Sequence, residues 1–346
     1  MKPARLVDAV LEASVVGSFT RLGYEARRRL YDWTPLDELR LDGQTAIVTG
    51  ATSGLGREAA ELLARQGADV CVVGRNAEKT ERIRTEIAGS ESDVADLSSL
   101  AETRAFAERF ATAHDRLDVL VLNAGALTHE FTLTEEGFEV TFATQVLSQF
   151  LLIRELLPLL EAAPSGRVIV VASGGTYVER LDVDALQPTP AEYDGVRAYA
   201  RAKRAQVALA EEWTRQLAGT NVTVNTMHPG WSDTPGLRTA LPGFSRAVSP
   251  LLRTVHQGAD TIAWLAASPA VAGRSGLFFL DRRPRPTHRK RSTRRLDEAR
   301  ERARLWELCQ RATDFRLYSE EDAQRVGRML EHLAAERVAQ GTRGAP

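Results

Sequence analysis

The chain has 346 residues, enough for one large α/β domain with additional segments or for two modest domains. Its 45 Lys and Arg residues against 46 Asp and Glu give a net charge of −1, which argues against nucleic acid as a partner and against a global attraction to anionic lipid. Two cysteines cannot form a disulfide framework and the six histidines show no zinc-type spacing, so we expect a reduced, cytoplasmic protein without a metal site.

Residues 1–40 are predicted to form an amphipathic helical extension, because apolar residues recur at helical spacing between residues 6 and 33 and arginines cluster late in this stretch. Two interpretations stay open. The apolar stripe could contact a membrane surface, or it could pack on the main domain, which is favoured because such stripes usually face a core. The chain shows no uninterrupted apolar run long enough for a transmembrane helix and no cleavage-site pattern of a signal peptide.

Residues 41–281 alternate between short apolar runs rich in β-branched residues and longer helical patterns. The predicted strands are 45–49, 68–73, 118–122, 167–172, 222–227 and 276–280, and the predicted helices are 57–65, 77–87, 100–114, 135–160 and 195–217. Buried strands separated by helices indicate βαβ units and a parallel sheet covered on both faces. We therefore expect an α/β Rossmann-type doubly wound sheet of about seven strands.

A glycine-rich loop follows the first predicted strand, with Gly50, Gly54 and Gly56 directly before a helix. Glycines in this context allow a tight turn and let a pyrophosphate approach the free N–H groups of the helix N-terminus. The second strand ends in Gly74-Arg75-Asn76, where an acidic residue would favour NAD. Because Arg75 offers a permanent charge for a 2′-phosphate instead, we expect NADP(H) to be preferred over NAD(H).

Tyr199 and Lys203 lie four residues apart in the predicted helix 195–217, so they share one helix face. A nearby ammonium favours the phenolate and lowers a tyrosine pKa that is about 10 in water. This spacing alone also occurs on ordinary solvated faces, so the pair gains meaning only from the motifs around it. Two neighbours are set aside: His228 precedes a proline and is interpreted as positional, and Tyr193 has Arg197 rather than a lysine four residues on.

Taken together and in order, these motifs resemble the short-chain dehydrogenase/reductase family and, within it, the retinol-dehydrogenase-like branch. The residues that carry the resemblance are Thr49-Gly50, Gly54, Gly56, Asp96-Leu97, Asn123-Ala124-Gly125, Ser173, Tyr199, Lys203, Pro229-Gly230 and Thr234, with Arg75-Asn76 and the apolar helix 142–152 for the branch. It implies Ser173, Tyr199 and Lys203 as catalytic residues. It implies these cofactor-binding residues: Gly50, Ser53, Gly54, Leu55, Gly56, Arg75, Asn76, Asp96, Leu97, Asn123, Ala124, Gly125, Tyr199, Lys203, Pro229, Gly230, Trp231 and Thr234.

The resemblance implies an oxidoreductase that moves a hydride between the nicotinamide and a carbonyl or alcohol. Ser173 would hold the substrate oxygen, Tyr199 would donate the proton, and Lys203 would lower the tyrosine pKa and hold the nicotinamide ribose. One departure stands out, because Gln145 occupies the position where the family usually has an asparagine in its proton relay. A relay could persist through the same amide group on one more methylene, or the chain could be a cofactor-binding scaffold or sensor with weak turnover.

Residues 231–254 are predicted to cap the substrate side with an apolar, irregular segment, which favours an apolar aldehyde or ketone over a sugar. Residues 282–295 carry eight Lys and Arg and no acid, and are interpreted as a solvated basic linker rather than a nucleic-acid or membrane patch, because no aromatic side chain is present to stack on bases. Helices predicted over 296–315 and 319–338 complete the segment 282–346 as packing or homo-oligomerisation elements.

Overall fold

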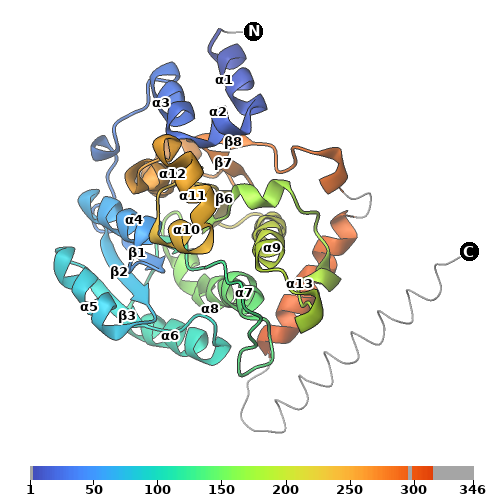
Figure 1. The fold of residues 1–346 in the computed structure, drawn as a ribbon. Coiled ribbons are helices and arrows are strands. Elements are labelled where there is room, and N and C mark those ends of the chain that lie inside the picture. The colour runs from blue at the N-terminus through green and yellow to red at the C-terminus, as the bar shows by residue number, and fades with distance from the viewer. Residues whose placement is uncertain (1–2, 295–297, 315–346) are drawn as a thin grey trace, which may run out of the picture.

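The computed structural model describes residues 3–294 and 298–314 (Figure 1). One sheet organises them, with strand order β3-β2-β1-β4-β5-β6-β7-β8. The strands are β1 Thr45–Thr49, β2 Asp69–Gly74, β3 Glu91–Val94, β4 Val119–Leu122, β5 Arg167–Val171, β6 Thr223–Met227, β7 Phe278–Leu280 and β8 Arg283–Arg285. Neighbouring strands are parallel from β3 to β7, and only β8 runs antiparallel. The predicted doubly wound α/β fold is confirmed.

Helices cover both faces of this sheet. The α-helices are α1 Pro3–Ala13, α2 Val15–Phe19, α3 Arg21–Leu30, α4 Gly54–Arg65, α5 Ala77–Glu86, α6 Leu100–Ala113, α7 Val140–Phe142, α8 Ser148–Ala162, α9 Gly195–Gln216, α10 Pro235–Ala240, α11 Pro242–Val248, α12 Val255–Ala267 and α13 Glu298–Asp314. The short helical turns are η1 Leu36–Glu38, η2 Ala143–Leu147, η3 Gly174–Tyr177, η4 Val183–Ala185, η5 Pro190–Glu192, η6 Ser249–Leu251, η7 Pro269–Val271 and η8 Arg291–Thr293.

Two hydrophobic cores lie on the two sides of the sheet. Helices α4, α5 and α12 bury their apolar faces on one side, and α6, α8 and α9 bury theirs on the other. Helix α13 adds to the second core, where Trp306 packs edge-on against Phe150 and Trp213 at centroid distances of 5.0 and 4.7 Å. The packing role expected for the first C-terminal helix is thus confirmed, while the helix predicted over 319–338 lies outside the described residues.

Two strands were missed because neither has the apolar signature of a buried strand. β3 reads Glu-Ser-Asp-Val and forms an exposed edge of the sheet. β8 pairs with β7 through a two-residue turn in which Asp281 and Arg282 both have positive φ, 55° and 56°. Such turns match the twist of the strands but usually use Asn-Gly, so Asp-Arg gave no signal.

The predicted helix over residues 135–160 was placed too early in the chain, and it is not one uninterrupted α-helix. Glu139 ends a turn and caps α7 by accepting hydrogen bonds from the N–H groups of Thr141 and Phe142. The chain then widens into one π-helical turn, η2, before α8 continues. π-helical turns inside helices often mark functional sites, and this one contains Gln145.

The N-terminal extension differs most from expectation. The single predicted helix is three, because Ser14 caps α2 and the chain is extended at Thr20. The favoured packing of its apolar stripe on the domain is wrong for α1, where Asp8 and Glu12 face inward and Leu6, Val7 and Val10 face outward. The acids pair with arginines of α3 and of the segment after β7.

The segment after residue 281 is not the solvated linker that we expected. Arg283–Arg285 forms strand β8, and the side chains of Arg282 and Arg285 are only 6% and 7% exposed. Arg282 pairs with Asp260 at 2.6 Å, and Arg285 pairs with Asp8 at 2.9 Å. Within the described chain, these arginines attach the N-terminal helices to the edge of the sheet.

Residues 140–162, spanning α7, η2 and α8, form the one stretch of the described chain with the length and apolar composition of a membrane span. Of its most apolar window, 72% is buried inside the molecule. Figure 1 shows α8 lying within the body of the fold, so its composition is explained by the core that it forms.

Candidate active site

The chain turns sharply between β1 and α4, where the predicted glycine loop lies. Gly50 has φ 66°, and a Cβ there would lie 2.9 Å from the Cα of Ala124. A Cβ on Gly56 would lie 2.4 Å from the carbonyl oxygen of Gly50. Ser53 makes no side-chain cap on α4, so the first N–H groups of this helix are left for an anion.

Asn123 joins this loop to the end of β4. Its side-chain amide donates to the carbonyl oxygen of Thr49 at 2.9 Å, and the N–H groups of Asn123 and Ala124 both donate to the Thr49 hydroxyl at 3.0 Å. The Asn123 side chain therefore holds the cofactor loop in shape. The sequence motif included Thr49 at the start of this loop, but it did not predict that the Thr49 hydroxyl accepts these two hydrogen bonds.

The end of β2 lies against the glycine loop. A Cβ on Gly74 would meet the side chains of Thr52 and Thr80 at 2.4 and 2.5 Å, so only glycine fits there without movement. Arg75 follows with an exposed guanidinium that makes no ion pair with any described residue. Asn76 has a structural task, because its side-chain oxygen caps α5 by accepting from the N–H of Lys79 at 2.9 Å.

Three further predicted cofactor segments converge on the same edge of the sheet. Asp96 folds onto its own loop, since its carboxylate accepts from the N–H of Ser98 at 2.9 Å, and Leu97 is buried beside it. After β6, the side chain of Thr234 would lie 3.5 Å from a Cβ on Gly54. The segments after β1, β3 and β6 thus meet where the carboxyl ends of the parallel strands lie, as expected for a ligand site in this fold.

The three predicted catalytic side chains come together at the end of β5. Ser173 follows this strand, and its hydroxyl oxygen accepts from the N–H of Gly175 at 3.2 Å. The Ser173 hydroxyl also lies close enough to the Tyr199 phenol to lower the pKa of that phenol. On the same face of α9, the ammonium of Lys203 lies 5.3 Å from the centroid of the Tyr199 ring and donates to the carbonyl oxygen of Val171 at 2.9 Å.

Burial sets the protonation of this cluster. It lowers the pKa of Lys203 to about 7, since the 3% exposed ammonium makes no ion pair with any described residue. Burial also raises the pKa of Tyr199, and the nearby Ser173 hydroxyl lowers it only in part. The expected lowering of the tyrosine pKa by Lys203 is not seen in this structure, where desolvation of the phenol dominates.

Gln145 lies beside this cluster in the π-helical turn. Its side-chain amide donates to the carbonyl oxygen of Ala126 at 2.9 Å, and its packing leaves no room for a Cβ on Gly125. Its main-chain carbonyl oxygen accepts from the side-chain amide of Gln206 at 2.8 Å, and Gln206 also donates to Gln149 at 2.7 Å. The carbonyl at the relay position is thus already hydrogen-bonded. Gln149 and Gln206 were not predicted, because isolated glutamines in helices carry no pattern.

Comparisons with known proteins agree with this geometry. A family model described as short chain dehydrogenase matches residues 44–242. The chain belongs to the short-chain dehydrogenase family.

This short-chain dehydrogenase is 40% identical over 278 residues to "Dehydrogenase/reductase SDR family member 12" of Bos taurus, covering 78% of this chain and 86% of the relative. It is 35% identical over 263 residues to "Retinol dehydrogenase 14" of Mus musculus, covering 70% and 78%. It also resembles a short chain dehydrogenase of Escherichia coli CFT073 complexed with NADPH, with a TM-score of 0.58, 25% identity, and coverage of 72% of this chain and all of that one. The predicted retinol-dehydrogenase-like branch is confirmed, and the enzyme is an NAD(P)-dependent oxidoreductase that acts on alcohol or carbonyl groups.

The residues of this dehydrogenase fit a dinucleotide. Side chains at Gly50 and Gly56 would collide with the backbone, Gly54 has a positive φ of 55°, and the uncapped start of α4 follows this turn. The deciding observation is that Thr234 and Gly54, distant in the chain, close on each other at the carboxyl end of the sheet. A pyrophosphate would be held by the glycine loop, and the ribose beside the nicotinamide by Tyr199 and Lys203.

The loop after β6 of the dehydrogenase connects the cofactor side to the N-terminal helices. Gly230 has φ 71°, and the N–H of Trp231 donates to the carbonyl oxygen of Phe19 at 2.8 Å. Phe19, Trp231 and Phe244 form an aromatic row with centroid distances of 5.9 and 5.0 Å. A Cβ on Gly174, next to Ser173, would lie 2.6 Å from the Phe19 ring. Phe19 was missed because it lies far from the family motifs in the sequence.

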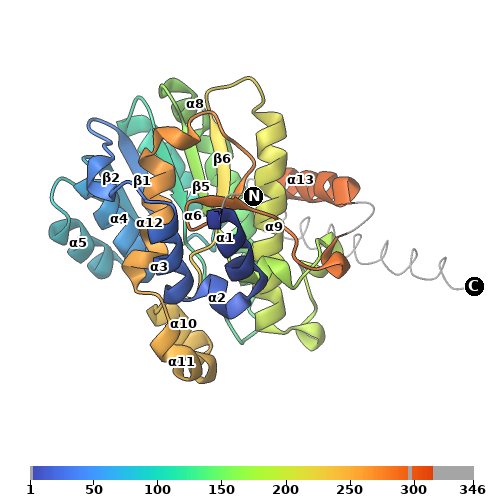
Figure 2. The ribbon, with the colours of Figure 1, turned by 90° about the horizontal axis from the view of Figure 1, so that it is seen from above.

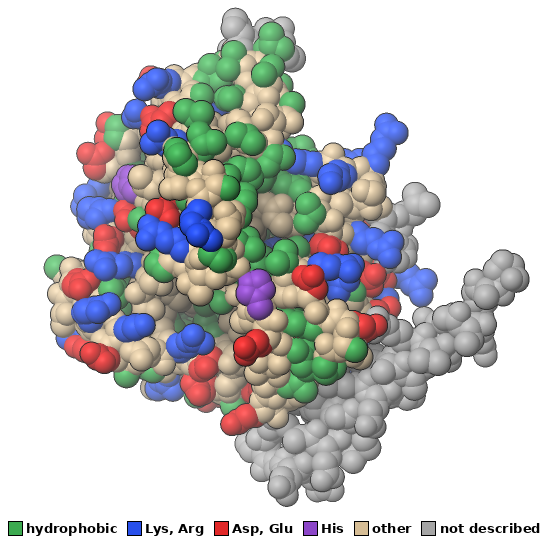
Figure 3. All heavy atoms as spheres, in the orientation of Figure 1, with side chains coloured by type: hydrophobic (Ala, Val, Ile, Leu, Met, Phe, Trp, Pro, Cys, Tyr) green, Lys and Arg blue, Asp and Glu red, His purple; other side chains and the backbone are tan. Residues whose placement is uncertain are grey.

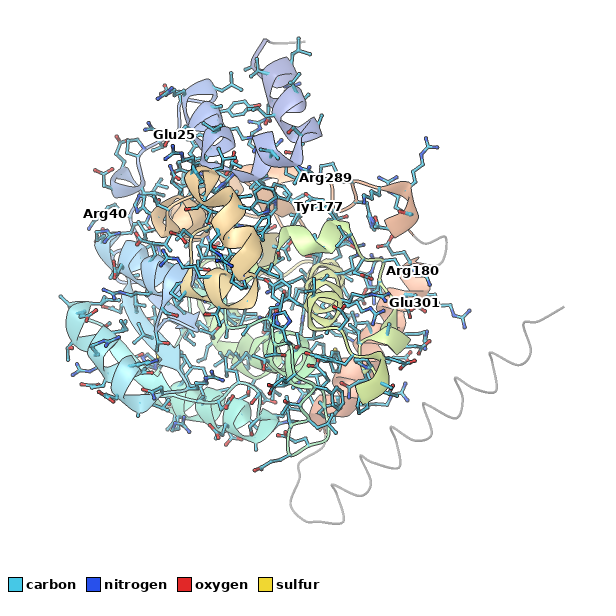
Figure 4. All side chains as sticks on the ribbon, viewed as in Figure 1. Glu25, Arg40, Tyr177, Arg180, Arg289 and Glu301 are labelled. Carbon is cyan, nitrogen blue, oxygen red and sulfur yellow. The ribbon has the colours of Figure 1, made fainter. Side chains whose placement is uncertain are left out.

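Two residues that we set aside have structural partners. The ring of His228 accepts from the N–H of Gly230 at 3.1 Å, and burial together with neighbouring arginines holds its pKa well below 6.5. Arg289 is among these arginines, and Figure 4 shows it next to Tyr177. The Tyr193 hydroxyl hydrogen-bonds that of Thr128 at 2.8 Å. Neither residue has the surroundings of a proton donor.

Proposed function

We propose that this short-chain dehydrogenase transfers a hydride between NADP(H), in preference to NAD(H), and an apolar aldehyde or ketone or the corresponding alcohol. The observation that carries the proposal is the meeting of Ser173, Tyr199 and Lys203 at the end of β5, beside the aromatic row. The reaction class follows from the family, and the finer choice of cofactor and substrate rests on the side chains around the site.

The chain's own residues supply orientation and one proton. In the reduction direction, the hydroxyl groups of Ser173 and Tyr199 would donate hydrogen bonds to the carbonyl oxygen, and the Tyr199 proton would pass to it as charge develops. The bound nicotinamide supplies the hydride. Lys203, with a pKa of about 7, can return a proton to the phenolate near neutral pH.

Arg75 supports the cofactor preference. It follows β2 with an exposed guanidinium and no ion-pair partner among the described residues, and Gly74 before it carries no carboxylate to repel a phosphate. A 2′-phosphate would gain a charge-assisted, bidentate hydrogen bond that the ribose hydroxyl of NAD cannot make.

The preference for an apolar substrate rests on residues 231–254. The ring centroids of Trp231 and Phe244 lie 5.0 Å apart, and Leu252, in the same segment, is buried. Figure 2 shows α10 and α11, which belong to it, projecting from the body of the molecule. The mouse relative is named a retinol dehydrogenase, which makes retinoids a reasonable first group of compounds to assay.

The central test compares Tyr199→Phe with wild type in an assay that follows NADPH oxidation with aldehydes, ketones and retinoids. Loss of the proton donor should lower kcat/KM by about 10²–10⁴-fold. Tyr193→Phe is the matched control, since it removes a phenol hydroxyl that lies close in sequence to Tyr199 but is hydrogen-bonded to Thr128. Turnover of Tyr199→Phe within a factor of two of wild type would sink the proposed mechanism.

The cofactor preference is tested by titrating NADPH and NADH against Arg75→Ser. Loss of the guanidinium should weaken NADPH binding about tenfold or more and leave NADH binding nearly unchanged. Arg82→Ser is the control, because Arg82 is also exposed but lies along α5 against Glu86 at 3.8 Å. A wild-type preference for NADH would show that the role given to Arg75 is wrong.

A second candidate function is a cofactor-binding scaffold or sensor with weak or no turnover. The observation that favours it is the hydrogen bond from Gln206 to the main-chain carbonyl of Gln145, which occupies the expected relay position. It predicts tight NADPH binding without turnover of any carbonyl, and no gain of activity in Gln145→Asn.

A further inference from the structure

Helix α1 has its charged face turned inward and its apolar face turned outward. Asp8 is 6% exposed and pairs with Arg27 at 2.7 Å and Arg285 at 2.9 Å. Glu12, one turn later, pairs with Arg27 at 2.9 Å. Because these contacts fix the orientation of the helix, its apolar side chains have no core to enter.

The outward side chains form an unusual concentration of exposed apolar surface. Of the ten exposed large hydrophobic side chains in the described chain, six lie on α1, α2 and the start of α3. We call this set the N-terminal apolar face: Leu6, Val7, Val10, Val15, Val16 and Leu22, which are 46–65% exposed. Figure 3 shows hydrophobic side chains gathered over α1 and α2. Single exposed apolar residues need no explanation, but a gathered set indicates an interaction surface.

The charges around this face have one sign. Between residues 4 and 30, the exposed charged side chains are Arg5, Arg21, Arg28 and Arg29. The acids of the same stretch are used inside the molecule or against neighbours, as Glu25 is with Arg28 and Gln257. An apolar face with an arginine margin is the pattern of segments that lie in the interface of an anionic membrane.

We propose that the N-terminal apolar face seats this enzyme on the surface of an anionic lipid bilayer. A second copy of the chain is the main rival occupant. A symmetric pair would bring the same arginines of both copies together, whereas anionic headgroups would neutralise them. The charge of the margin therefore favours lipid over self-association.

The face also adjoins the active site. Helix α2 carries Val15 and Val16 outward and ends at Phe19, whose ring lies against Gly174 beside Ser173 and against Trp231. Val178, the residue directly after η3, is 60% exposed. When the enzyme lies on a bilayer, the aromatic row would be close to apolar molecules dissolved in the lipid. Only this consequence for the substrate rests on the proposed function.

Vesicle sedimentation of the full chain tests the proposal, with phosphatidylcholine vesicles that contain or lack phosphatidylglycerol. Wild type should bind the anionic vesicles, and Leu6→Asp/Val10→Asp should lower the affinity about tenfold or more. Arg5→Gln and Arg21→Gln should each lower it about fivefold on anionic vesicles, an effect that salt reduces. Leu133→Asp, at a residue 52% exposed outside the face, should bind like wild type.

Thermal melting checks that each variant is folded, and Val16→Asp on α2 is a second, independent probe of the face. The proposal fails if wild type does not sediment with anionic vesicles, or if the face variants sediment as wild type does. Self-association is supported instead if light scattering shows that wild type is a dimer, that the face variants are monomers, and that neither form binds vesicles. None of these readouts depends on turnover, so an inactive enzyme that binds vesicles would contradict the proposed function alone.

Discussion

Lys203 and Arg27 are both buried cations, but only Arg27 lies among carboxylates. Arg27 and Arg253 share Asp281 at 2.7 and 2.6 Å, and Asp8 completes the cluster. Within the described chain, the ammonium of Lys203 contacts the carbonyl oxygen of Val171 and the Tyr199 ring, and it pairs with no carboxylate. Carboxylates pair with the arginines and turn them into structural links, while their absence leaves the lysine titratable near pH 7.

The largest effect that this contrast predicts is on activity. Lys203→Met should lower turnover by about 10²–10⁴-fold, because the proton supply to Tyr199 is lost. It should not lower the melting temperature at pH 7, since an unpaired buried ammonium costs solvation energy when charged. Lys79→Met, at an exposed position of α5, is the control for both measurements. Activity within tenfold of wild type would remove Lys203 from the mechanism.

The converse holds for the arginine cluster. Asp281→Asn leaves Arg27 and Arg253 buried without their shared carboxylate, and should cost about 3–5 kcal/mol of unfolding free energy. Asparagine tolerates the positive φ at this position, so the loss reports charge and not backbone strain. Denaturant unfolding measures it.

The control for Asp281→Asn is Asp233→Asn, which removes an exposed ion pair with Arg238 at 2.6 Å. Exposed pairs contribute about 0–1 kcal/mol. If the two substitutions cost the same, the cluster is not the structural link that its geometry indicates.

A smaller effect is expected in the pH dependence of stability. The pKa of Lys203 is about 7 in the folded chain and about 10.4 in an unfolded one. Between these values the unfolded chain holds a proton that the folded chain lacks, so this group makes the unfolding free energy rise with pH from about 7. Burial raises the pKa of Cys71 and Cys309, which acts in the opposite sense above about 8.5.

The difference in unfolding free energy between wild type and Lys203→Met isolates the lysine, because the other groups contribute equally to both. This difference should change steadily between about pH 7 and 10.4, the folded and unfolded pKa values of the lysine. Parallel curves for the two proteins would mean that Lys203 titrates normally despite its burial.

The sequence predicted those parts of the molecule in which a local pattern has one physical meaning. Apolar runs such as Arg167–Val171 are strands because both of their faces are buried. Glycines are required at 50 and 56 by close contacts of one turn, and at 54 by a positive φ. The family motifs likewise predicted Ser173 and Tyr199, whose hydroxyl groups lie near each other at the end of β5.

The missed features depend on partners far away in the chain. β8 is polar and exists because β7 pairs with it, and Phe19 reaches the active site only because Arg253 and Trp231 bind its carbonyl oxygen. The predicted orientation of α1 was wrong because helical periodicity predicts which residues share a face, but not which face points into the molecule. Arg27 and Arg285 settle that by binding Asp8.

The smallest effect tests the edge of the arginine cluster. Burial opposes ionisation of Asp8, but hydrogen bonds from Arg285 and Arg27 outweigh it and lower its pKa to about 2. A carboxylate with a lowered pKa stabilises the fold above its unfolded value of about 3.9, and this stabilisation is lost as pH falls toward 2.

Asp8→Asn should therefore cost about 1–2 kcal/mol of unfolding free energy at pH 7. This is less than for Asp281→Asn, because Arg27 keeps Asp281 and Glu12 as partners. The cost should shrink between pH 4 and 2, whereas Asp42→Asn, at an exposed pair with Arg40, should cost little at any pH. A loss at Asp8 as large as that at Asp281 would mean that α1 is held by this one carboxylate.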